Sequence, residues 1–214
     1  MAKGKDLILD DYFENDFEDE YEYQIDYDYT TYEQSVTGYD AEGQITSALD
    51  YVTSDDMPKM YMTEGHGEVG LTSAYESGIA KQNVDYETIN LMEYDAVPED
   101  AACLLINAPV SDFNSDDKDK VIEYLSGGGK VIAVIGYTDA ALTNFEEILA
   151  YMGLTLADGM IVEQSSQNYY QSPYYLLPTV KYSTYTNGIY NKYYIFAPYA
   201  RGIQIVDKEA EGMK

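Results

Sequence analysis

Residues 58–82 read PKMYMTEGHGEVGLTSAYESGIAKQ, and this stretch decides the expected fold class. A short apolar run at 59–63 is followed by a G-x-G-x-x-G loop at 65–70 and then by a segment of helical character. Strand, glycine loop and helix in this order are typical of a dinucleotide-binding unit, in which glycines let the backbone approach a pyrophosphate. The loop nevertheless carries Glu64 and Glu68, and carboxylates so close to a phosphate would repel it by several kcal/mol. The loop therefore has the pattern of a phosphate cradle and the opposite charge.

The chain beyond this loop alternates between helical and strand-like segments. Helices are expected at 71–82, 115–126 and 142–152, and strands at 86–92, 102–107, 130–135 and 157–162. Ser115 is the expected N-cap of the second helix, and the glycines at 127–129 are expected to end it. Apolar strands that alternate with helices of this length indicate a parallel sheet covered on both faces. We expect an α/β fold, a three-layer sandwich with a mainly parallel sheet from residue 58 to about 163.

The first part of the chain has a different composition. Residues 1–40 hold thirteen acidic residues and two lysines. Between Tyr21 and Tyr29 apolar or aromatic residues alternate with polar, mostly acidic ones, which predicts a half-buried strand with an acidic outer face. A calcium-binding loop is the alternative, although the EF-hand spacing is absent. Residues 42–53 form an apolar stripe at helical spacing, which predicts an amphipathic helix packed on one face of the sheet; the stripe consists of Ile45, Ala48, Leu49 and Val52.

The net charge of −27 is distributed unevenly. Residues 41–163 carry a net −18, whereas residues 164–206 contain no Asp or Glu and carry a net +3. An acidic surface of this size argues against binding to nucleic acid or to anionic headgroups. The acid-free part holds nine tyrosines between residues 169 and 194. Tyrosine suits both cores and interfaces, so this segment either packs on its own domain or presents a surface to a protein or glycan.

The chain as given contains no run of 18 apolar residues and no signal-peptide pattern at its start. We therefore expect no transmembrane helix within it. The single cysteine, Cys103, lies in an apolar run and cannot form an internal disulfide. A small buried hydrophobic side chain is the expected role of Cys103, and a reactive thiol is the alternative.

Several segments together resemble a known family. They are GQITSALDYV at 43–52, KMYMTEGHGE at 59–68, VPEDA at 97–101, LLINAP at 104–109 followed by Ser111-Asp112, YLSGGGK at 124–130 and APYAR at 197–201. Over residues 35–205 the chain resembles the extracytoplasmic domain of GldG-type, gliding-motility-type ABC transporter auxiliary components. The combination of GHGE with the later P-x-D-A and I-N-x-P motifs carries most of this resemblance.

The resemblance implies a flavodoxin-like or glutamine-amidotransferase-like sheet without known catalysis. Composition sets apart an acidic, tyrosine-rich strand segment at 1–40, expected to be the remainder of a preceding region, of which residues 1–34 lie outside the resemblance. The resemblance implies the α/β domain at 41–206 and a tail at 207–214 leading to a membrane helix outside the chain. The expected location is the outer face of the cell membrane. The expected partners are the permease and ATPase subunits of the same transport system, with an extracytoplasmic protein or glycan as a further candidate.

In open parallel sheets ligands bind outside the carboxyl ends of the strands. The candidate ligand-binding residues at that rim are Glu64, His66, Glu68, Asn107, Ser111 and Asp112, with residues 136–139 completing it. We expect no catalytic residue, no cofactor and no metal there. We also expect the substitution His66→Ala to leave the fold intact while altering the function of the transporter complex in cells.

Three alternatives compete at this rim. The first is a Rossmann-like nucleotide-binding enzyme that uses Gly65, Gly67 and Gly70, with Glu93 or Asp95 as the ribose-binding acid. The second is a metal ion held by Glu64, His66 and Glu68. The third is amidotransferase-like chemistry, which requires a cysteine on a glycine-flanked elbow with a histidine partner, and Cys103 lacks the flanking glycines.

Overall fold

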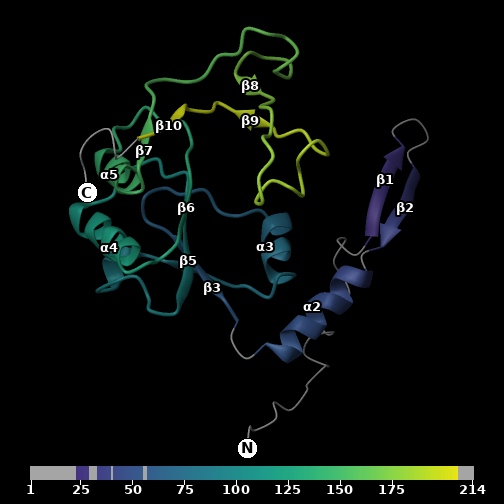
Figure 1. Ribbon diagram of the computed structural model, residues 1–214, viewed down its shortest axis with the longest axis horizontal. Coiled ribbons are helices and arrows are strands. Elements are labelled where there is room, and N and C mark those ends of the chain that lie inside the picture. Colours follow the sequence, from purple (N-terminus) through teal and green to yellow (C-terminus); the bar gives the residue numbers. More distant parts are fainter. Residues whose placement is uncertain (1–22, 29–32, 40, 55–56, 207–214) are drawn as a thin grey trace, which may run out of the picture. The chain divides into compact units, whose positions relative to one another are not determined.

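The computed structural model describes residues 23–28, 33–39, 41–54 and 57–206, and Figure 1 shows its helices and strands. The chain divides into two compact units. One comprises the chain up to Lys59 together with Leu71–Tyr86, and the other comprises Met60–Gly70 together with the chain from Glu87 onward.

A four-stranded, all-parallel sheet lies at the centre of the fold. Its strands follow the order β4 (Asp85–Ile89), β3 (Lys59–Thr63), β5 (Ala101–Asn107) and β6 (Val131–Val134). The first strand of the glycine-loop motif is thus an interior strand, paired on both sides. The sheet is flanked by helices, so the predicted α/β class, a three-layer sandwich with a parallel sheet, is confirmed.

Two helices cover one face of this sheet. α4 (Ser115–Ser126) and α5 (Thr143–Tyr151) pack against each other (Figure 1). The core between helices and sheet consists of fully buried side chains, among them Leu104, Ile106, Val121, Phe145 and Ile148. Each such side chain contributes about 1.5–3 kcal/mol relative to an exposed position, so this layer holds the sheet and both helices together.

The other face of the sheet is not covered at its β6 edge. Leu105 pairs with Ile132 and Asn107 with Val134, so these side chains share one face. Ile132 is 52% exposed and Val134 is 43% exposed. The expectation of a sheet covered on both faces is therefore wrong for β6.

The strand expected at 157–162 is absent. The strand at this point is β7 (Leu154–Leu156), and it pairs antiparallel with β10 (Ile203–Ile205), outside the parallel sheet. Gly159 has φ +73°, a left-handed conformation that suits a turn and interrupts an extended run. The Asp158-Gly159 pair was the sequence signal for this turn.

Two further boundaries differ from the prediction. β4 ends at Ile89, because the Asn90 side chain accepts a hydrogen bond from Met92 N and starts the 3₁₀-helix η1 (Leu91–Glu93). The N-cap of α4 is Asn114 rather than Ser115. Asn114 Oδ1 accepts from the backbone N–H of Asp117 at 2.8 Å, which is the usual way an asparagine caps a helix.

The first unit contains the predicted acidic strand. β1 (Tyr23–Asp28) pairs antiparallel with β2 (Glu33–Tyr39), while Tyr21, Glu22 and Tyr29 lie outside the described residues. The calcium-loop alternative also lies largely outside them. The unit further contains α2 (Ala41–Thr53) and α3 (Ser73–Ala80), which confirm the helices predicted at 42–53 and 71–82.

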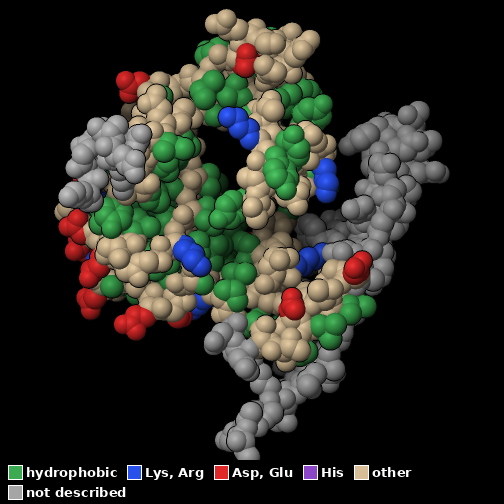
Figure 2. All heavy atoms as spheres, viewed as in Figure 1, with side chains coloured by type: hydrophobic (Ala, Val, Ile, Leu, Met, Phe, Trp, Pro, Cys, Tyr) green, Lys and Arg blue, Asp and Glu red, His purple; other side chains and the backbone are tan. Residues whose placement is uncertain are grey.

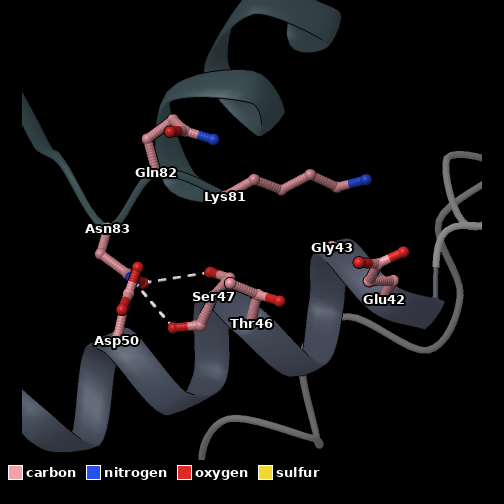
Figure 3. Close-up of a pocket in the computed structure, with 8 residues that line it drawn as sticks. All are labelled: Glu42, Gly43, Thr46, Ser47, Asp50, Lys81, Gln82 and Asn83. Carbon is pink, nitrogen blue, oxygen red and sulfur yellow. Dashed lines mark hydrogen bonds between the residues drawn. The ribbon is translucent and has the colours of Figure 1, made fainter.

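The apolar stripe of α2 is exposed, contrary to expectation. Ile45 is 62% exposed and Leu49 is 58% exposed, so these side chains are not part of a buried core. The opposite face of the helix is the one that packs, through buried Ser47. Ser47 Oγ donates to Asn83 Oδ1 at 3.3 Å, and Asn83 Nδ2 donates to Ser47 O at 2.8 Å (Figure 3).

The tyrosine-rich part of the chain has little regular structure. It contains a short antiparallel pair, β8 (Tyr175–Leu176) and β9 (Ala197–Pro198). Across the described part of the chain, no helix combines the length and the apolar character needed to cross a bilayer.

Candidate functional site

The glycine loop follows β3 and turns back over the carboxyl ends of the sheet strands. Gly65 has φ +110° and Gly67 has φ +72°, conformations that favour glycine. A Cβ on Gly67 would also lie 2.5 Å from Val110 Cγ2. Gly70 has neither constraint, because a Cβ added there would meet no atom within 4 Å. Two of the three glycines thus serve the turn, and the close-packing role of the third glycine in a dinucleotide site is absent.

His66 is the centre of this loop, and it points into the protein. Its ring stacks on Phe113 with 3.9 Å between ring centroids and an interplanar angle of 9°. Its Nδ1 lies 3.1 Å from Glu68 Oε1, and its Nε2 lies 3.4 Å from Asp117 Oδ2. The three side chains are only 5%, 2% and 0% exposed, respectively. We call His66, Glu68, Asp117 and Phe113 the histidine clasp.

Asp117 is held from its other side by α4. Asn114 Nδ2 donates to Asp117 Oδ2 at 2.6 Å, and Lys120 Nζ lies 3.5 Å from Asp117 Oδ1. Lys120 also donates to Leu91 O at 2.9 Å and pairs with Asp116 Oδ2 at 2.6 Å. The buried carboxylates of Glu68 and Asp117 are therefore in contact with two basic side chains, those of His66 and Lys120.

The electrostatics of the histidine clasp favour the charged form of both partners. Burial alone would lower the pKa of His66, but the hydrogen bond and charge of Glu68, with those of Asp117, raise its pKa above 6.5. Burial would likewise raise the pKa of Glu68, but the His66 ring and nearby backbone N–H groups lower its pKa below 4.5. Between pH 4.5 and 6.5 the clasp is therefore an ion pair of imidazolium and carboxylate, shielded from water.

Three backbone amides of the loop donate to acceptors within the protein. His66 N donates to Glu68 Oε2 at 2.7 Å, Val69 N donates to Asn107 O at 2.9 Å, and Glu64 N donates to Ile89 O at 2.9 Å. Asn107 Nδ2 donates to Val69 O, which fastens the loop to the end of β5 from a second direction. A phosphate cradle needs loop N–H groups directed at the ligand, and here these three are directed at protein acceptors.

The remaining predicted site residues are separated by role. The backbone N–H of Ser111 donates to His66 O at 2.9 Å, while the Ser111 side chain is exposed. Asp112 accepts from Asn144 N at 3.0 Å and from Phe145 N at 3.1 Å, so it caps the start of α5. Glu64 is exposed. The structure thus brings His66 and Glu68 into direct contact, joins Asn107 and Ser111 to the same loop, and commits Asp112 to a helix end.

Comparison with known proteins gives the fold and no family. No protein-family model matches the chain, and no curated protein matches it. A solved structure described as "mmIFT52 N-terminal domain" is similar over 70% of this chain and 69% of that chain, with a TM-score of 0.54 and 12% sequence identity. At this identity the similarity shows a shared α/β fold alone.

Sequence reasoning missed Asp117, Lys120 and Phe113. Asp117 lies in the first turn of α4, where an acidic residue is ordinarily explained by the helix dipole alone. A usable signal was present, because Asp117, Lys120 and the core residue Val121 recur at the i, i+3, i+4 spacing of a single helix face. A charged pair on an apolar face predicts a buried partner, and His66 is that partner.

The metal alternative finds no support in the geometry. Among the residues that the structure describes, no three His, Cys, Asp or Glu side chains are arranged to hold a metal ion. Glu68 and Asp117 face different ring nitrogens of His66, and Glu64 is exposed. Cys103 lies inside β5, where burial raises the pKa of its thiol and so disfavours the reactive thiolate.

A polar groove of about 410 Å³ lies in the first unit, between α2 and the residues that follow α3 (Figure 3). Its α2 side runs from Glu42 to Asp50, and Lys81, Gln82 and Asn83 line the other side. Its middle is bridged by the hydrogen bonds between Ser47 and Asn83, which join the groove's two walls. The groove therefore lies along the contact that joins α2 to the residues after α3.

Proposed function

We propose that this chain is a non-enzymatic binding or coupling domain of an auxiliary subunit of an ABC-type transport system, exposed on the outer face of the membrane. The family resemblance of the GHGE, P-x-D-A and I-N-x-P segments supports the transport context. The partners would be the permease and ATPase subunits of the same system.

One observation supports the non-catalytic role more than any other. The glycine loop contains its own anion, because Glu68 Oε2 accepts the His66 N–H at 2.7 Å while Glu68 Oε1 contacts the His66 ring. A nucleotide phosphate would have to displace this buried carboxylate and would be repelled by it at close range. The loop has the turn of a phosphate-binding loop, but the Glu68 carboxylate accepts the loop N–H in place of a phosphate oxygen.

The same geometry argues against His66 as an acid–base group. A general base must reach a substrate proton, within about 3.2 Å or through one water. Both ring nitrogens of His66 face carboxylates, and its ring face is stacked on Phe113. This arrangement suits a side chain that fixes a loop to α4.

A ligand screen separates this proposal from the nucleotide-binding alternative. Thermal unfolding of the chain would be measured with ATP, GTP, NAD, NADP, FMN and divalent cations, each at increasing concentration. We expect no saturable shift. A saturable stabilisation of about 2.7 kcal/mol, which corresponds to a ligand at about 100 times its Kd, would favour the Rossmann-like enzyme instead.

The transport context needs a test in cells. The full-length protein would carry a photo-crosslinking amino acid at exposed positions, and the crosslinked products would be identified by mass spectrometry. We expect the permease or ATPase subunit of an ABC transporter among them. Crosslinks confined to proteins without any transporter component would refute the proposed context.

A further inference from the structure

Residues 164–206 form the part of the domain that differs most from the rest in composition. They contain no Asp or Glu, whereas the whole chain has a net charge of −27. Residues 165–199 include ten tyrosines, four serines and three asparagines. Antibody paratopes use the same mixture, because tyrosine gives large contact area at low entropic cost and small polar residues give adaptable hydrogen bonds.

Most of these aromatic side chains are on the surface. Tyr185 is 98% exposed and Tyr194 is 89% exposed, and Tyr170, Tyr182, Tyr193 and Phe196 are also exposed. We call this set the tyrosine surface. Leu176 is the single buried hydrophobic residue that the structure describes between 164 and 206. The segment therefore does not use its aromatic residues to build a core, which weighs against the alternative of a loop packed on its own domain.

The base of the tyrosine surface is ordered by backbone and ring contacts. β8 and β9 pair through Tyr175 with Pro198 and Leu176 with Ala197. The Tyr175 ring meets Tyr199 edge-on at 5.5 Å and Phe196 at 5.7 Å between ring centroids. A second ring pair, Tyr182 with Tyr190 at 5.5 Å, orders the other part of the segment. Rings held in this way lose less entropy when a partner docks on them.

Charge restricts which partner can dock here. Figure 2 shows hydrophobic side chains and Lys or Arg around β8 and β9, with an acidic side chain beside β8, while Asp and Glu side chains are most numerous at the edge beside α4. Glu163 precedes the acid-free segment and accepts hydrogen bonds from Ser165 N and Asn168 Nδ2. Lys181 and Lys192 are exposed in this segment, and Arg201 contacts Glu146 and Ala157 of its own domain. A basic partner would be drawn to the acidic remainder of the domain, whereas residues 164–206 offer an acidic partner two exposed lysines and no carboxylate.

We propose that the tyrosine surface is a docking site for an acidic protein segment that carries aromatic side chains, supplied by another molecule. Aromatic side chains of the partner pack on the exposed tyrosines, and its carboxylates face Lys181 and Lys192. This inference deepens the proposed binding role and rests on it.

The chain itself supplies a probe with this chemistry. Residues 10–28 hold ten carboxylates interleaved with tyrosine and phenylalanine. A fluorescently labelled synthetic peptide of this sequence would be titrated with the full chain, and binding would be followed by fluorescence anisotropy. We expect saturable binding at physiological ionic strength, where a Debye length of about 8 Å limits the repulsion from the acidic remainder of the domain and leaves the short-range pairing with Lys181 and Lys192.

Two control peptides separate the contributions. A peptide with every Asp and Glu replaced by Asn and Gln should lose binding, and so should a polyglutamate of equal length. Equal binding of the polyglutamate would show that charge alone is read, and would overturn the aromatic part of the inference. Sedimentation velocity of the full chain, with and without unlabelled peptide, shows whether copies of the chain use the site between themselves.

Variants place the site on the structure. The double substitution Tyr185→Ser and Tyr194→Ser should weaken peptide binding about tenfold or more, as is usual for aromatic anchor residues of an interface. Both side chains are almost fully exposed, so the fold should not change. Tyr75→Ser is the matched control, because Tyr75 is 69% exposed but lies on α3.

A result against the docking inference can be told apart from a result against the proposed transport function. Absent peptide binding, equal binding by the double variant, or saturable binding of chitohexaose in place of the peptide would each overturn this inference, the last in favour of a glycan surface. Crosslinks to transporter subunits in cells would survive such a result if the proposed function is right. Loss of those crosslinks in the double variant, and not in Tyr75→Ser, would connect the two.

Discussion

Replacing His66 by alanine is expected to lower the free energy of unfolding by about 3–5 kcal/mol, the usual consequence of removing one partner from a buried ion pair. The substitution leaves Glu68 and Asp117, 2% and 0% exposed, without the imidazolium between them. It also removes the ring stacked on Phe113. Domains of this kind are stable by about 5–15 kcal/mol, so the variant should be far less stable. The structure thus replaces the sequence-based expectation that this variant leaves the fold intact.

Urea unfolding measures the effect. The chain has no tryptophan, so far-ultraviolet circular dichroism and tyrosine fluorescence are the appropriate probes. His66→Gln should be less harmful than His66→Ala, because an amide can still donate to one carboxylate. Glu64→Ala is the matched control in the same loop, and its exposed position predicts a change within about 0.5 kcal/mol. A loss below about 1 kcal/mol for His66→Ala would show that the histidine clasp contributes little.

The dependence on pH follows from the directions of the two pKa shifts. The pKa of His66 is raised above 6.5, so its stabilising contribution is fully present below 6.5 and is lost as the pH rises through the folded-state pKa. The pKa of Glu68 is lowered below 4.5, so its contribution is present above 4.5 and is lost as the pH falls through its folded-state pKa. The clasp should therefore stabilise most between about pH 4.5 and 6.5. Because the chain has one histidine, its ring proton resonance can be titrated directly by NMR, and a midpoint below 6.5 would contradict this reasoning.

Further substitutions test the loop, the helix cap and the core. Gly67→Ala should destabilise by about 1–3 kcal/mol, because of its positive φ and the overlap with Val110, whereas Gly70→Ala should be nearly neutral; urea unfolding of both variants compares them. Asp112→Ala should cost about 1–2 kcal/mol through loss of the α5 cap, and Asp112→Asn should recover part of it, as calorimetry would show. Leu49→Ala should change stability by less than about 0.5 kcal/mol, because this side chain is exposed, while a truncation in the core should cost about 2–5 kcal/mol in the same assay.

The parallel sheet could be predicted because its signals are local and redundant. Strands β3, β5 and β6 are short apolar runs, and α4 is bounded by a capping residue and by glycines. Two predictions were wrong because they relied on apolar composition and ignored turn-forming residues or the identity of the buried face. The 157–162 run is broken by Asp158-Gly159, and the exposed stripe of α2 shows that helical periodicity reports amphipathic character without saying which face is buried.

The candidate site could be predicted only in part. The sequence placed His66, Glu68 and Asn107 at one rim, because the ends of parallel strands meet there. It could not show that Asp117 reaches His66, since the two residues are far apart in the chain and only tertiary packing joins them. The direction of the His66 side chain, inward rather than toward the rim, depends on Phe113 in the same way.

The glycine loop has a phosphate-binding pattern and acidic side chains. These two features conflict only if the loop binds an external phosphate, and not if Glu68 itself is the anion. Positive φ at Gly65 and Gly67 creates the turn of the cradle regardless of what fills it. Glu68 then accepts the loop N–H that a phosphate oxygen would accept, and His66 supplies the opposite charge. A loop built in this way has no need of a ligand to be stable, so the sheet rim becomes a rigid support. Under the proposed binding role, recognition would fall to side chains exposed elsewhere, and the tyrosine surface, in a segment without Asp or Glu, is the candidate that the composition sets apart.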